Sequence, residues 1–204
     1  MIKIIGGTTA TPMKITAINQ ESQAINSLKY YGDANIVPSD ASLFGFTLSP
    51  YGGGAIESPN GVLPKDVVIP YEASVEGETL PITFLWDGCF ASNGGVENLV
   101  IPNTLVEIGV SVFEGCNSLK SITISEGVKR ICSNAFNGCT LENVYYTGTK
   151  AQWDAINISG GNDALSNATI HYKWSDVTNE DIGKIGEALE ELHNYAQALI
   201  GGEA

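Results

Sequence analysis

Residues 105–116 read LVEIGVSVFEGC and residues 128–139 read VKRICSNAFNGC. The two segments begin 23 residues apart and share the same residue type at four positions, namely Ile, Phe, Gly and Cys. Phe90 lies a further 23 residues upstream of Phe113. A fixed period of roughly 20 to 50 residues is typical of a solenoid, in which each repeat forms one coil that stacks on the next.

Eight apolar positions recur in register over two consecutive repeats. They are Val96, Leu99, Ile101, Leu105, Ile108, Val112, Phe113 and Cys116 in the first, and Leu119, Ile122, Ile124, Val128, Ile131, Ala135, Phe136 and Cys139 in the second. The alternation at the start of each repeat predicts short strands at Leu99–Ile101, Ile122–Ile124 and Val144–Tyr146. Because a column of Phe side chains fills the other side of each coil, stacking buries edges that one repeat could not bury alone.

The segment before the regular repeats also has the pattern of β structure. Residues 43–48 alternate in part, and residues 50–54 and 59–61 carry turn signals. We expect a hairpin turn at the glycine run 52–54, which lacks the Lys-Ser/Thr sequence of a phosphate loop. The solenoid is therefore predicted to start with an irregular first coil.

The repeat pattern resembles a known family. Val-x-x-Ile-x-x-x-Ala-Phe-x-Gly-Cys at residues 128–139 is similar to the BspA-like leucine-rich repeat. Val112 replaces a frequent Ala of that pattern, and Trp86 replaces a usual Gly. Residues 145–153 resemble the ending common in the family, with a closing strand expected at Ala168–Tyr172. The resemblance covers about residues 42–172. It implies a short leucine-rich-repeat solenoid of the α/β repeat class, it implies surface-exposed or virion adhesion proteins as relatives, and it implies no catalytic residue.

Three parts follow from these patterns. Residues 1–41 are predicted to be an N-terminal cap or attachment segment, with an amphipathic helix over about 15–29. Residues 42–175 form the solenoid, and residues 176–204 form a C-terminal helix that is a candidate oligomerisation segment.

The C-terminal helix carries a heptad pattern of apolar residues. These candidate oligomerisation residues are Ile182, Ile185, Leu189, Leu192, Ala196 and Leu199. Their 3-4-3-4-3 spacing places them at a and d positions, and Ile at both positions favours a homotrimer over a dimer. Two interpretations stay open: a short self-associating coiled coil, or one helix that packs on its own solenoid.

The charge balance excludes several classes of partner. The formal net charge is −13 and the sequence pI is about 4.4. No Lys/Arg cluster is present to replace phosphate counterions, so nucleic acid is not an expected partner. No run approaches the roughly 18 apolar residues of a membrane span. Residues 1–13 show no apolar core of a signal peptide, so we expect no export by the usual route.

The cysteines and histidines do not form a catalytic or metal-binding pattern. Cys116 and Cys139 occupy the same position of adjacent coils, where a small buried thiol fits. No C-x-x-C pair supports a zinc site. His171 and His193 lie in no nucleophile motif. We therefore predict no catalytic residue, no metal site and no cofactor.

A cluster of aromatic residues near the end of the solenoid is the remaining candidate site. Tyr145, Tyr146, Trp153 and Trp174 could bind a protein or glycan partner, or they could be part of the core and cap. Both interpretations stay open at this stage.

These observations favour a non-enzymatic structural or adhesion protein. A repeat of this type without an export signal suits a phage tail or baseplate component that presents its solenoid to a host or another virion protein. The alternative is a bacterial leucine-rich-repeat module that acts as a monomer at the cell surface or in the cytoplasm.

Overall fold

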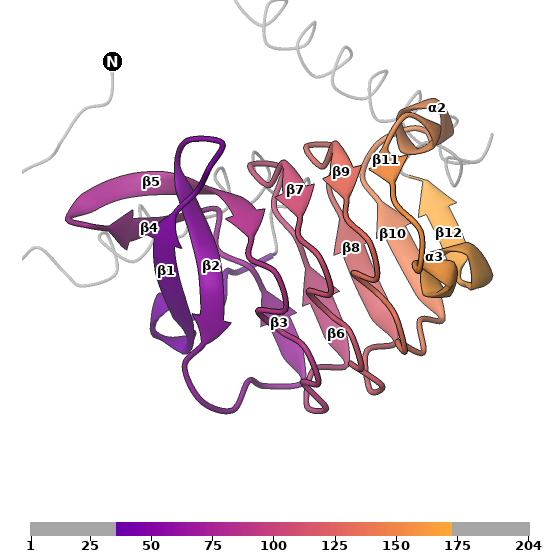
Figure 1. Ribbon diagram of the computed structural model, residues 1–204, viewed down its shortest axis with the longest axis horizontal. Helices are drawn as coiled ribbons and strands as arrows, with labels where there is room; N and C mark the ends of the chain where they lie inside the picture. Colours follow the sequence, from indigo (N-terminus) through magenta and orange to yellow (C-terminus); the bar gives the residue numbers. More distant parts are fainter. Residues whose placement is uncertain (1–35, 173–204) are drawn as a thin grey trace, which may run out of the picture.

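The computed structural model describes residues 36–172, which form a solenoid with one sheet along each of two sides (Figure 1). The predicted heptad helix, Trp174, His193 and most of the predicted attachment segment lie outside the described residues. Before the regular repeats the elements are η1 (Ala41–Leu43), β1 (Phe44–Leu48), β2 (Gly54–Pro59), β3 (Asp66–Val68), β4 (Glu72–Val75) and β5 (Glu78–Leu85). They are followed by β6 (Asn98–Val100), β7 (Glu107–Ile108), β8 (Ser121–Ile124), β9 (Arg130–Ile131), β10 (Asn143–Tyr146), α2 (Lys150–Asp154), β11 (Asn157–Ile158), α3 (Asp163–Asn167) and β12 (Thr169–Tyr172).

Each regular coil contributes one strand to each sheet. The five-stranded sheet has the order β12-β10-β8-β6-β3, and all its pairs are parallel. The seven-stranded sheet has the order β1-β2-β5-β7-β9-β11, with β4 paired to β5. The strands predicted at the start of each repeat are confirmed as β6, β8 and β10, and the predicted closing strand is confirmed as β12.

The N-terminal part departs from the regular coil, as predicted. β1 and β2 pair antiparallel, and the Ser49 amide donates to the Gly53 carbonyl at 2.9 Å to close the hairpin turn. β4 and β5 form a second antiparallel pair. Helices are few: α2 and α3 have five residues each and η1 has three. The described fold is therefore a β-solenoid, and helices contribute little to the expected α/β repeat.

A column of stacked Phe rings fills the interior. The Phe90 and Phe113 rings stack with centroids 5.4 Å apart, and Phe113 and Phe136 stack at 5.1 Å. The ring of Phe44, from β1, meets Phe90 edge-on at 6.3 Å and covers the N-terminal end of the column. All four rings are buried, so the column is continuous through the core.

The backbone makes tight turns at two positions that recur between coils. Gly115 and Gly138 have φ of +73° and +74°, a conformation in which Gly carries no steric penalty. Ser92 occupies the equivalent position one repeat earlier with φ of +59°. The second position holds Ser111 and Asn134, with φ of +55° and +58°. The recurrent Gly of the sequence pattern is thus explained by turn geometry.

The side chain of Asn162 ends the ladder of backbone hydrogen bonds at the last coil. The Phe113 amide donates to the Ala135 carbonyl at 2.8 Å, whereas the Phe136 amide donates to Asn162 Oδ1 at 3.0 Å. Asn162 Nδ2 donates to the carbonyls of Cys132 (2.9 Å) and Ser159 (2.8 Å). Asn162 is buried, and its bonds to the Phe136 amide and the Cys132 carbonyl satisfy groups that water does not reach.

The cysteines repeat one structural role from coil to coil. The Cys116 thiol donates to the Phe90 carbonyl at 3.1 Å, and the Cys139 thiol donates to the Phe113 carbonyl at 3.1 Å. All four cysteines are free thiols; three are buried and Cys139 is partly buried. Burial raises the pKa of the Cys139 thiol to about 12, so it stays protonated and can donate.

Replacing the central ring of the column tests how much the stacked Phe rings contribute to stability. We expect Phe113→Ala to lower the free energy of unfolding by about 3–5 kcal/mol, because it leaves a cavity between two stacked rings. The measurement is equilibrium unfolding in urea. Val62→Ala is the control, since Val62 is 92% exposed and should change stability by less than about 0.5 kcal/mol. A loss below about 1 kcal/mol for Phe113→Ala would contradict the stacking.

Removing the terminal Asn side chain tests the cap. We expect Asn162→Ala to destabilise by at least about 2 kcal/mol, because one buried amide and two carbonyls lose their partner. The same urea titration measures it, with Asn167→Ala on the exposed end of α3 as the control. Equal stability of Asn162→Ala and Asn167→Ala would contradict this, because it would show that water replaces the hydrogen bonds of the Asn162 side chain.

Candidate interaction face

The outward surface of the five-stranded sheet carries two rows of side chains that run across the strands. Strand pairing aligns Asp66, Asn98, Ser121, Asn143 and Thr169 in the first row. It aligns Val68, Val100, Thr123, Tyr145 and His171 in the second row, which we call the stripe. The residues between the two rows, such as Ile122 and Val144, point inward and are fully buried.

The stripe changes character along the solenoid. It is aliphatic at Val68 and Val100, polar at Thr123 and aromatic at its C-terminal end. The Tyr145 ring is 44% exposed and stacks on the His171 ring at a centroid distance of 4.7 Å and an interplanar angle of 16°. The other four side chains of the stripe are partly exposed. The stripe is thus a line of partly exposed side chains that are aliphatic or aromatic except at Thr123.

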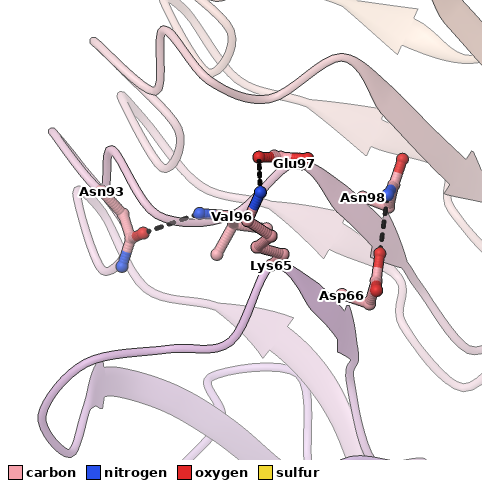
Figure 2. Close-up of polar contacts among 6 residues, drawn as sticks. All are labelled: Lys65, Asp66, Asn93, Val96, Glu97 and Asn98. Carbon is pink, nitrogen blue, oxygen red and sulfur yellow. Dashed lines mark hydrogen bonds and ion pairs between the residues drawn. The ribbon is translucent and has the colours of Figure 1, made fainter.

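Polar side chains border the stripe on one side. Figure 2 shows the end of this border at β3 and β6, where Asn98 Nδ2 donates to Asp66 Oδ1 at 2.6 Å. At the other end, His171 Nε2 lies 3.0 Å from Asn143 Oδ1. Both contacts join neighbouring strands, so they fix the orientation of side chains next to the stripe.

A line of alternating charges lies beyond this polar row. Lys65 Nζ lies 2.6 Å from Glu97 Oε1, as Figure 2 shows, and Lys120 Nζ lies 3.1 Å from Glu142 Oε1. The hydrogen bond from Lys65 to Glu97 raises the pKa of Lys65. Asn93 shapes the turn before β6, because its Oδ1 accepts from the Val96 amide at 3.3 Å (Figure 2). The charges are paired between coils and are exposed to solvent.

Three of the four aromatic residues predicted as a partner site lie in the described part of the chain, and one of these three is exposed. Tyr146 and Trp153 are 2% and 7% exposed and pack edge-on at 5.2 Å, so they belong to the core. Trp153 lies in α2, whose N-terminus has a capping box between Thr149 and Gln152. Tyr145 alone among the three described residues faces solvent, on the stripe.

The sequence could not group the stripe, because its spacing is irregular. Val100 and Thr123 keep the 23-residue period, but Val68, Tyr145 and His171 do not. Only the strand register places all five residues in one line.

The opposite sheet carries a buried carboxylate that the sequence did not indicate. Glu107 is 7% exposed; its Oε2 accepts from the Tyr51 hydroxyl at 2.6 Å and its Oε1 accepts from the Cys132 thiol at 3.2 Å. Burial, with help from Glu107, raises the pKa of Cys132 to about 11, so the thiol is protonated. The Glu107 bond also raises the pKa of Tyr51. The Tyr51 hydroxyl and the Cys132 thiol are therefore donors, and the Glu107 carboxylate accepts from both.

Within residues 36–172, no group of three or more His, Cys, Asp or Glu side chains is placed to hold a metal ion. Over the same residues, no helix combines the length and apolarity that crossing a membrane requires.

The repeats match a known family. Residues 83–159 match the family model described as BspA type leucine rich repeat region, in six copies. These residues are thus similar to BspA-type leucine-rich repeats. The match agrees with the resemblance seen in the sequence, and the fold is that of a leucine-rich-repeat solenoid. No curated protein matches the chain.

Solved structures resemble the chain in fold. A leucine-rich repeat protein from Bacteroides capillosus has a TM-score of 0.51 at 18% identity, with 66% of this chain and 96% of that chain covered. The T. pallidum leucine rich repeat protein has a TM-score of 0.49 at 20% identity, covering 66% and 71%. A leucine rich cell surface protein from Faecalibacterium prausnitzii has a TM-score of 0.43 at 26% identity, and the match covers 59% of this chain and 34% of that one.

The ion pairs beside the stripe should contribute little to stability. We expect Lys65→Ala and Lys120→Ala each to change the free energy of unfolding by less than about 1 kcal/mol, because both pairs are exposed. Urea unfolding at low and high salt measures this. A larger, salt-sensitive loss would show that the charge line holds the coils together.

Proposed function

We propose that this protein is a non-enzymatic interaction module and that the stripe binds a protein partner. The observation that carries the proposal is the line of partly exposed apolar and aromatic side chains that ends at the stacked Tyr145–His171 pair. Single exposed apolar residues are ordinary, but an aligned set with a polar border marks an interaction surface.

The surface has the anatomy of a protein interface. Such interfaces have an apolar or aromatic centre and a polar rim, and Tyr is among the residues that contribute most to binding. The stripe supplies the centre, and the hydrogen-bonded and charged rows supply the rim. Four strand-to-strand steps of about 4.8 Å make the stripe roughly 19 Å long, which suits a protein surface better than a small ligand.

The backbone behind the stripe is rigid, which favours binding. Ile122 and Val144 anchor the strands in the core from the inner side. The cross-strand contacts of Asn98 and Asn143 hold the border in place. Little conformational freedom is then lost when a partner binds.

Site-specific photo-crosslinking tests the proposal. A benzoylphenylalanine at Thr123, in the middle of the stripe, should crosslink a protein from an extract of the source organism, whereas the same group at Asn157 on the opposite sheet should not. Val100→Lys should abolish the Thr123 crosslink, because it places a charge in the apolar centre. Equal crosslinking from both positions, or none from Thr123, would contradict the proposal.

A narrower role, as a phage tail or baseplate component, rests on the sequence pattern of residues 176–204. In this proposal the heptad residues hold three copies together, and the avidity of three stripes compensates for weak single contacts. The alternative is a monomeric bacterial binding module, at the cell surface or in the cytoplasm, that uses the same stripe.

The solution mass separates these two roles. For the tail component we expect the full chain to scatter light as a trimer and a chain ending at Val177 to scatter as a monomer. Far-UV circular dichroism of the shorter chain checks that the solenoid is intact. If the full chain is a monomer, the trimeric tail component is contradicted and the monomeric binding module is favoured.

A further inference from the structure

We propose that a second surface, formed by Tyr51 and Trp86 on the opposite sheet, binds a neutral glycan by stacking against the C–H face of a sugar ring. This surface and the stripe lie on different sheets, so the inference does not depend on the protein partner proposed above.

The two exposed rings flank a buried one. Tyr51 meets Phe84 edge-on at a centroid distance of 5.7 Å, and Phe84 meets Trp86 edge-on at 5.1 Å. Phe84 is buried, whereas Tyr51 is 50% and Trp86 36% exposed. Phe84 therefore contacts both rings, and each of the two presents part of its surface to solvent.

Tyr51 is fixed at its hydroxyl as well as at its ring. The residue lies in the turn between β1 and β2, and its hydroxyl reaches Glu107 on β7, 56 positions along the chain. The Cys132 thiol and the Arg130 guanidinium, whose Nη1 lies 3.7 Å from Oε2, hold that carboxylate. The Tyr51 ring is thus set by contacts with two coils before any ligand arrives.

The turn that carries Tyr51 is itself tied to β5. The Thr83 hydroxyl donates to the Gly52 carbonyl at 2.8 Å. Gly53 has φ of +86°, and a Cβ there would lie 2.6 Å from the Pro81 carbonyl oxygen, so only Gly permits this approach. A surface ordered in advance loses little entropy on binding, which matters most for weak ligands such as sugars.

Trp86 has no counterpart in the following coils. Gly109 and Cys132 stand at the positions 23 and 46 residues later, and both are buried. The repeat therefore packs without a large side chain at this position, and Trp86 exposes about a third of its surface. Trp86 and Tyr51 together therefore form an exposed aromatic surface that the later coils do not repeat.

The chemistry around the rings favours a neutral sugar. Tyr and Trp combine apolar faces with a polar atom, and a sugar combines a C–H face with hydroxyls at its edge. Arg130 and Asp87 are exposed and can hydrogen-bond such hydroxyls. Asp87 already orients its carboxylate by accepting from the Val110 amide at 2.7 Å. The carboxylates of Asp87 and Glu107, with a net charge of −13 on the chain, disfavour sulfated or carboxylated glycans.

Saturation-transfer NMR with chitotriose, cellotriose and maltotriose tests the inference on the full chain. We expect at least one of these neutral sugars to receive saturation, and we expect Trp86→Ala to weaken that sugar's Kd by about tenfold or more. Tyr51→Phe keeps the ring but removes its bond to Glu107, and should weaken binding less. Val62→Ala, at an exposed residue that belongs to neither surface, is the control and should leave sugar binding unchanged.

Thermal unfolding of each variant shows whether it is folded. If Trp86→Ala is unfolded, sugar binding by Tyr51→Phe provides the test. The inference is overturned if none of the three sugars binds, if both variants bind as the natural chain does, or if chondroitin sulfate binds as well as the neutral sugars. A protein crosslinked from benzoylphenylalanine at Trp86, without sugar binding, would assign this surface to a protein instead.

Discussion

The structure depends on one constraint: each coil must return the chain to the same place, so that Phe stacks on Phe. The ring-to-ring distances of 5.4 and 5.1 Å are close to the spacing of neighbouring strands, so one coil advances by one strand on both sides. A period of 23 residues meets this requirement between Phe90 and Phe136. The recurrent Gly and Cys also keep the coils in register. The Gly makes the turn, and the thiol donates to the carbonyl of the Phe in the previous coil.

The solenoid has two ends, and each end is capped in a different way. At the N-terminal end, an antiparallel hairpin brings the Phe44 ring onto the column. At the C-terminal end, Asn162 supplies the acceptor that a further coil would have supplied. Terminal repeats of solenoids are expected to be atypical in this way, because they have a neighbour on one side only.

The repeated part could be predicted from the sequence because identical contacts recur at one spacing. The strands of the repeats and the Phe column were predicted for this reason, whereas the closing strand was predicted from the family resemblance. The caps could not be predicted: Phe44 and Asn162 occur once each and belong to no repeat. The turn at Ser92 was not predicted either: Ser92 lies one period before Gly115, but Ser does not signal a positive φ as Gly does.

The surfaces were harder to predict than the core. The stripe joins strands at unequal spacing, and the Tyr51–Glu107 bond joins residues 56 positions apart. Aromatic composition alone did not separate surface from core, since Tyr145 is exposed while the adjacent Tyr146 is buried. Strand alternation makes that distinction, because neighbouring residues of a strand face opposite sides.

The continuous column of stacked rings implies that the coils unfold together as one cooperative unit. Native-state hydrogen exchange of the Phe113→Ala variant tests this through two distant amides: Trp86, which donates to the Ile56 carbonyl, and Thr147, which donates to the Ile124 carbonyl. Neither bond involves the coil that contains Phe113. We expect both amides to exchange faster than in the natural chain, by a similar factor. Faster exchange confined to residues 96–116, with Trp86 and Thr147 unchanged, would contradict it.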